Sequence, residues 1–133
     1  MAHALNKVWI HTVWTTKHRS PVLKQEIEED LYRFIKVQFE ELDCPARIVN
    51  GMPDHIYCLF MLHPTRSIVE VIKQVKGSSS RYINAENLVA GGFSWQVGYG
   101  AFSVSYGILD KIYYYIRNQK KHHAANRKDP IEW

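Results

Sequence analysis

The stretch ARIVNGMPDHIYCLFML, residues 46–62, contains two strand-like runs separated by turn residues. Residues 46–51 and 55–62 are rich in β-branched, aromatic and other apolar side chains, which favour extended backbone. The GMPD segment between the runs is typical of a tight turn. The stretch therefore predicts a β-hairpin, and a sheet containing it should organise the fold.

Upstream of this hairpin, a strand pattern is followed by a helix pattern. Residues 6–16, NKVWIHTVWTT, are β-branched and aromatic, and they predict a first strand. Residues 24–42 space their apolar side chains by three and four, which predicts an amphipathic helix.

Downstream of the hairpin, Ser67 and Glu70 have the spacing of a capping box, which predicts a second helix over about 68–83. The KGSSSRY segment is a weak helix former, so fraying or a kink is expected near Gly77. A turn at the glycine pair 91–92, two short strands within 93–104 and a third helix over 107–123 complete the pattern.

The resulting order, β-α-β-β-α-β-β-α, predicts an α+β, ferredoxin-like fold. Its sheet should be mainly antiparallel, with the helices over one face. No repeat or linker divides the chain, so residues 1–133 are expected to form one domain.

Composition narrows the classes of protein. Hydrophobic residues make up 46% and charged residues 23%, which is typical of a soluble globular protein. No apolar run approaches the roughly 18 residues needed to cross a bilayer, and the N-terminus does not resemble a signal peptide. The two cysteines, Cys44 and Cys58, argue against a disulfide framework or a zinc finger, and a reducing cytoplasm is expected.

The charge of the chain favours an anionic partner. The net charge is +4 and the pI is about 9.1, and nucleic acid is the commonest partner of basic domains. Two basic clusters, TTKHRSPVLK (15–24) and RNQKKHHAANRK (117–128), are equally well explained as solvated segments. On charge and placement alone, the predicted phosphate-binding residues are Lys17, Arg19, Lys73, Lys76 and Arg81.

His55 and Tyr57 are the first candidate site residues. Because side chains alternate along a strand, both should point to one face of the sheet. They could form half of a metal site, or they could be ordinary packing. His11 could approach His55 if the two strands are neighbours.

Tyr115 and Gln119 are the second candidate pair. They are four residues apart, so they should share a helix face beside the apolar stripe. A phenol can attack a phosphodiester when a metal polarises the phosphate. A tyrosine at the edge of the core is the alternative, and Tyr113 and Tyr114 compete for any special role.

Five segments together resemble a known family. They are HTVWTTKHR (11–19), GMPDHIYCLF (51–60), SSSRYIN (78–84), WQVGYGAFSVS (95–105) and YYYIRNQKKHH (113–123). In this order and spacing, they are similar to the single-tyrosine HUH transposases of the smallest bacterial and archaeal insertion sequences and their repeat-associated relatives.

The resemblance implies a homodimer that cleaves and rejoins single-stranded DNA at imperfect hairpins. It implies Mg²⁺ or Mn²⁺ held by two histidines and a glutamine, and a helix tyrosine that becomes linked to the 5′ end of the DNA. By this resemblance His55 is the first histidine, Tyr115 the nucleophile and Gln119 the glutamine.

The sequence departs from the family pattern at Tyr57, which stands where the second histidine is expected. A phenol has a pKa of about 10 and must lose its proton to bind a metal well. Tyr57 could bind as a phenolate or through water, His11 or water could complete the site, or the metal site could be lost. In the last case the chain would only bind hairpin DNA, and a basic domain that binds RNA is a further alternative.

Overall fold

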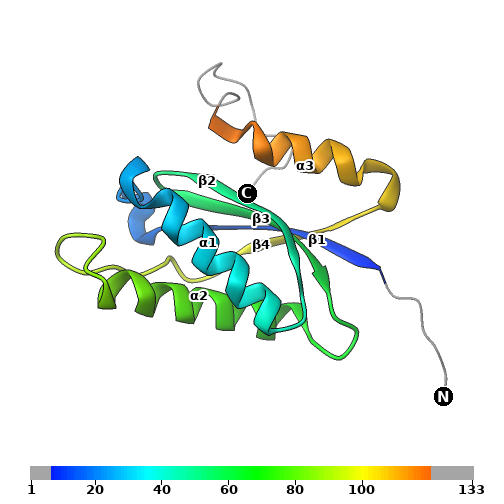
Figure 1. The fold of residues 1–133 in the computed structure, drawn as a ribbon, viewed down its shortest axis with the longest axis horizontal. Helices are drawn as coiled ribbons and strands as arrows, with labels where there is room; N and C mark the ends of the chain where they lie inside the picture. The colour runs from blue at the N-terminus through cyan, green and yellow to red at the C-terminus, as the bar shows by residue number, and fades with distance from the viewer. Residues whose placement is uncertain (1–6, 121–133) are drawn as a thin grey trace.

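The computed structural model describes residues 7–120. Figure 1 shows the arrangement of the elements, whose bounds are β1 Val8–Thr15, η1 Lys17–Arg19, α1 Gln25–Glu41, β2 Ala46–Met52, β3 His55–Leu62, α2 Ile68–Ala85, β4 Gly100–Val104, η2 Tyr106–Ile108 and α3 Leu109–Arg117. Most of the second basic cluster and the end of the expected third helix lie outside the described residues. Within 7–120, no helix is long and apolar enough to cross a membrane.

The sheet has four strands in the order β2-β3-β1-β4, and every neighbouring pair is antiparallel. Strand β3 lies between β1 and β2, as in the split β-α-β unit of ferredoxin-like folds, so the predicted fold class is confirmed. Residues 93–104 provide one strand rather than two. Trp95 makes only an isolated bridge to Thr16, and Gly98 has a φ of 97°, which interrupts extended backbone before β4.

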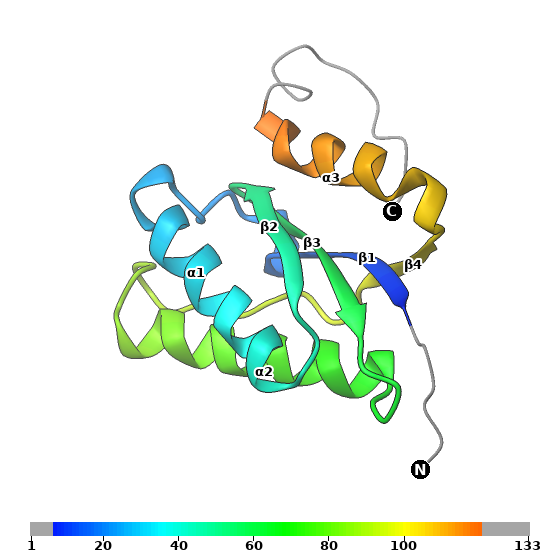
Figure 2. The ribbon, with the colours of Figure 1, turned by 45° about the vertical axis from the view of Figure 1, so that its right-hand side comes forward.

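Helices cover both faces of this sheet, so the prediction that all of them lie over one face is wrong. Helices α1 and α2 cover one face and α3 lies over the other, as Figure 2 shows. Strand β3 explains the arrangement, because Ile56, Cys58 and Phe60 enter the core beneath α1 and α2, whereas Tyr57 and Leu59 face α3. A strand that is apolar on both sides needs cover on both sides.

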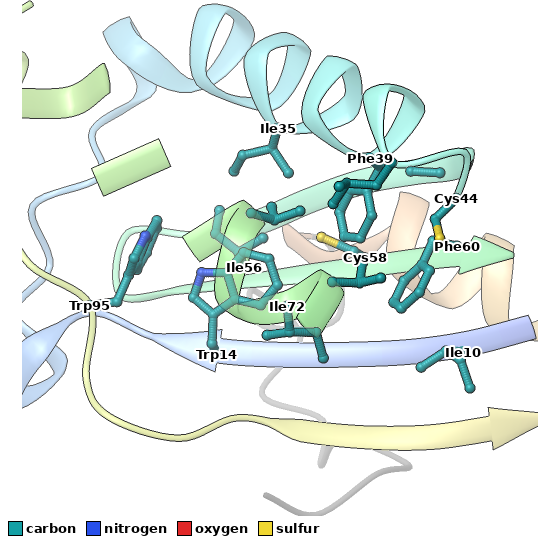
Figure 3. Close-up of a cluster of buried hydrophobic side chains, with 14 of the residues drawn as sticks. Ile10, Trp14, Ile35, Phe39, Cys44, Ile56, Cys58, Phe60, Ile72 and Trp95 are labelled. Atoms are coloured by element: carbon teal, nitrogen blue, oxygen red, sulfur yellow. The ribbon is translucent and has the colours of Figure 1, made fainter. Parts of the chain in front are cut away.

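The core beneath α1 and α2 is large and aromatic (Figure 3). Phe39 stacks on Phe60 with ring centroids 4.7 Å apart, and Trp14 meets Trp95 edge-on at 5.9 Å. Cys44 and Cys58 are fully buried free cysteines in this core, where burial raises the pKa of each thiol.

Helix α2 begins as predicted and then runs unbroken through Gly77. Ser67 Oγ accepts a hydrogen bond from the Glu70 backbone N–H at 3.1 Å, which confirms the cap. The expected fraying is absent from Ile68–Ala85, because tertiary contacts secure the serine-rich part. Ser79 Oγ donates to the Val75 carbonyl at 2.7 Å and accepts from Trp95 Nε1 at 3.0 Å.

Candidate active site between β3 and α3

Strand β3 places His55 and Tyr57 side by side on the face that α3 covers. Their ring centroids are 5.0 Å apart, and the two residues are 4% and 3% exposed. The turn before them is formed by Pro53 and Asp54, as the hairpin pattern predicts. His55 and Tyr57, the first and third residues of β3, therefore form one side of a buried, largely aromatic site.

Of the three consecutive tyrosines on α3, Tyr115 is the one that lies at this site. Tyr115 is buried, and its ring centroid lies 6.1 Å from that of Tyr57. Tyr113 instead lies beneath the Arg47 guanidinium, 4.5 Å from its ring centroid, and Tyr114 is 51% exposed. The helix rotation thus favours Tyr115 over its two competitors, a distinction that requires knowing where α3 packs.

Helix α3 ends before it reaches Gln119. Its last residue is Arg117, and Asn118 has a φ of −98° and a ψ of 22°, outside helical values. The helix predicted over 107–123 is therefore interrupted at Asn118, and the backbone is helical again at Gln119 and Lys120. Gln119 is nevertheless fully buried, whereas Arg117 and Asn118 are exposed, so Gln119 lies on the inner side of the segment with Tyr115.

Asp54 orients the His55 ring. Its Oδ1 atom accepts a hydrogen bond from His55 Nδ1 at 2.7 Å, and its Oδ2 atom lies 3.4 Å from Arg19 Nε. With a proton on Nδ1, Nε2 is the ring nitrogen that has the donor chemistry of a metal ligand. The sequence analysis missed Asp54, although its position immediately before His55 was the available signal.

His11 lies against Tyr57, and the strand register separates it from His55. Strands β1 and β3 are neighbours, but His55 pairs with Thr15, whereas His11 pairs with Leu59. Four residues of strand span about 13 Å at roughly 3.3 Å each. The His11 ring meets Tyr57 edge-on at 5.2 Å and Phe102 at 6.2 Å, so the register opposes the alternative in which His11 joins His55.

The predicted phosphate-binding residues do not form one group. Lys17 and Arg19 lie at the end of β1, where Arg19 reaches Asp54, whereas Lys73, Lys76 and Arg81 lie on α2, across the sheet from α3. Lys73 and Arg81 line an open groove of about 710 Å³. Lys76 donates to the backbone carbonyls of Gln96 and Gly98 at 2.8 and 2.7 Å, and burial lowers its pKa. Lys76 therefore anchors the loop before β4.

The donors around His55 suit a divalent cation in part. Residues 7–120 contain no cluster of three or more His, Cys, Asp or Glu residues arranged to hold a metal. An imidazole nitrogen from His55 and an amide oxygen from Gln119 are suitable donors for Mn²⁺ or Mg²⁺. The phenol of Tyr57 fits only after losing its proton. The donor set is thus compatible with a metal and weaker than one with two histidines.

The split β-α-β sheet and the buried tyrosine, histidine and glutamine on its α3 side agree with the resemblance seen in the sequence. The family described as "Transposase IS200 like" matches residues 4–119, and the chain belongs to this family. The resemblance seen in the five sequence segments is confirmed.

Individual relatives agree with this assignment. The chain is 27% identical to the ISDra2 transposase TnpA of Deinococcus radiodurans over 114 residues, covering 82% of this chain and 81% of the relative. A crystal structure of a candidate transposase from Deinococcus radiodurans R1 is similar with a TM-score of 0.70 and 25% identity, covering 90% and 95% of the two chains. A REP-associated tyrosine transposase bound to a REP hairpin shares the fold, with a TM-score of 0.65 and 14% identity over 92% of this chain and 72% of that one.

Proposed function

We propose that this transposase-family chain binds hairpin-bearing single-stranded DNA and cleaves and rejoins it through a covalent 5′-phosphotyrosine at Tyr115. The observation that carries the proposal is the burial of Tyr115 against β3, 6.1 Å from Tyr57 and on the same face as His55. The neighbouring tyrosines have other surroundings, and one of them is 51% exposed. His55 and Gln119, both buried on the same side, supply polar groups that packing alone does not need.

In the proposed reaction, the Tyr115 hydroxyl loses its proton and its oxygen attacks the scissile phosphorus. The bond from phosphorus to the 3′ oxygen breaks, and that oxygen takes up a proton to become a free 3′ hydroxyl. Rejoining reverses the exchange, since a 3′ hydroxyl attacks the phosphotyrosine and releases Tyr115. A bound Mg²⁺ or Mn²⁺ would polarise the phosphate.

We assign the metal-binding role to His55 and Gln119, with Tyr57 in the second-histidine position. The contact of His55 Nδ1 with Asp54, which orients the ring, supports the first assignment. The burial of Gln119 supports the second. Tyr57 would contribute as a phenolate or through water. The second candidate function, a hairpin-binding protein without cleavage activity, is favoured by this same residue, since a neutral phenol is a poor ligand.

The proposed partner is a DNA hairpin, and the groove lined by Lys73 and Arg81 offers positive charge for its backbone. Lys17 and Arg19 offer further charge near the proposed site.

We also propose a single domain over residues 1–133, a homodimer as the assembly and the cytoplasm as the place of action. Strand β4 ends one side of the sheet, and an edge strand can pair with another chain.

The test is a cleavage assay on a single-stranded hairpin carrying the flanks of the gene, with and without Mn²⁺. The proposal expects a covalent protein–DNA adduct that Tyr115→Phe abolishes while hairpin binding persists. Tyr114→Phe is the matched control and should form the adduct normally. Tight hairpin binding without any adduct would instead establish the non-catalytic function, and stronger binding to an unrelated single-stranded RNA would contradict both.

A further inference from the structure

We propose that Asn50 is a positioning residue, whose side-chain amide ends α3 at Arg117 and so sets the orientation of Gln119 relative to Tyr115. This inference rests on the proposed function of Tyr115 and Gln119. Asn50 lies on β2, where it pairs directly with Tyr57 of β3. This one pair of opposed residues therefore supplies both the Tyr57 ring that packs against Tyr115 and the Asn50 amide that reaches the end of α3.

The contacts of Asn50 are with two consecutive helix carbonyls. Its Nδ2 atom donates to the carbonyl oxygen of Ile116 at 2.8 Å and to that of Arg117 at 3.3 Å. In an uninterrupted helix these oxygens would accept from backbone N–H groups four residues further on. The Asn50 amide donates to both oxygens at the point where the helix is interrupted. The Asn118 N–H still makes the regular helical bond to the Tyr114 carbonyl at 3.0 Å, and it also reaches the Ile116 carbonyl, so the helix is regular up to this residue.

The break falls between the two residues whose geometry matters. Tyr115 directly precedes the first carbonyl that Asn50 holds, and Gln119 follows the second by two residues. In a continuous helix Gln119 would lie one turn beyond Tyr115 at a fixed angle. The non-helical Asn118 changes that angle while Gln119 stays buried. The orientation of Gln119 thus depends on a residue from the hairpin.

Other contacts secure α3 without touching this break. Arg47 forms an ion pair with Asp110 at 2.8 Å and covers the Tyr113 ring, so it holds the first half of α3 on β2. Lys120 Nζ contacts the Gly51 carbonyl at 3.1 Å and Glu28 at 3.0 Å, beyond the break. Arg47 therefore provides a matched control, because its loss loosens the same helix at the other end.

The test compares Asn50→Asp and Arg47→Ala with the wild-type chain. Aspartate keeps the shape of asparagine but cannot donate to the two carbonyls. We expect Asn50→Asp to bind the hairpin with a Kd within about twofold of wild type and to form the Tyr115 adduct about tenfold or more slowly in single turnover. A small displacement of reacting groups has an effect of that size. Arg47→Ala should slow the adduct less than Asn50→Asp.

A structural readout makes the outcome independent of activity. The Cα chemical shift of Asn118 reports its backbone conformation, and it should change in Asn50→Asp and stay near the wild-type value in Arg47→Ala. An unchanged shift in Asn50→Asp, or a rate that falls only in parallel with hairpin affinity, would overturn the inference. A wild-type chain that forms no adduct would refute the proposed function instead, and the Asn118 shift would then decide whether Asn50 ends α3.

Discussion

Removing the Asp54 carboxylate should weaken metal binding at His55. The bond from His55 Nδ1 to Asp54 Oδ1 is 2.7 Å long, and the His55 side chain is 5% exposed. Hydrogen bonds to charged groups contribute about 1.5–3 kcal/mol, and each 1.4 kcal/mol corresponds to roughly tenfold in an equilibrium constant. Asp54→Ala is therefore expected to raise the Kd for Mn²⁺ by about 10- to 100-fold, the range known for outer-shell partners of metal-binding histidines.

The assay is calorimetric titration of the DNA-free chain with Mn²⁺, which needs no catalytic turnover. Asp54→Asn is the matched control, because its amide oxygen still accepts from Nδ1 and the loss should be smaller. Arg19→Ala should have less effect than Asp54→Ala, since the Arg19 side chain is 60% exposed and its contact with Asp54 is 3.4 Å. Equal affinity in wild type and Asp54→Ala would refute the role of Asp54 in orienting the ligand.

Three further predictions concern Tyr57, the α2 lysines and Ser79. Tyr57→His should lower the Kd for Mn²⁺ by about tenfold or more, since an added ligand should exceed an outer-shell effect. Tyr57→Phe should raise the Kd if the phenol binds the metal. Identical titrations for wild type, Tyr57→His and Tyr57→Phe would show that Tyr57 is not part of the metal site. Lys73→Ala should reduce the salt dependence of hairpin binding, measured by anisotropy, by about one phosphate contact. Lys76→Ala should instead mainly lower the free energy of unfolding, by about 1 kcal/mol, because Lys76 bonds two backbone carbonyls. Equal salt slopes for the two variants would contradict this division. Ser79→Ala should cost about 1–3 kcal/mol in denaturant unfolding because Trp95 Nε1 loses its acceptor, and Ser78→Ala, the control, should cost less.

Elements decided by local sequence were predictable. The turn at Pro53 and Asp54 and the cap at Ser67 depend on residues within a few positions of each other, and both are confirmed. The continuity of α2 through Gly77 was not predictable from propensity, since Trp95 stabilises Ser79 from 16 residues away. Tertiary contacts commonly override such weak preferences.

The placement of α3 depended on features that a single sequence shows only in part. The unbroken apolar run of β3 was evidence for cover on both faces, and that evidence was not used. The choice of Tyr115 among three tyrosines required the rotation of α3 against β3. The end of the helix before Gln119 required Asn50, which is 66 residues from the carbonyl of Ile116. No local pattern reports such a contact.

The burial of both cysteines makes the chain convenient for site-specific labelling. Alkylation by maleimides requires the thiolate, and a raised pKa together with full burial keeps Cys44 and Cys58 as unreactive thiols near neutral pH. Since the sequence has no other cysteine, one introduced at an exposed position such as Val97, which is 93% exposed, would be the single reactive group. A fluorophore could be attached there without any need to remove the native cysteines first.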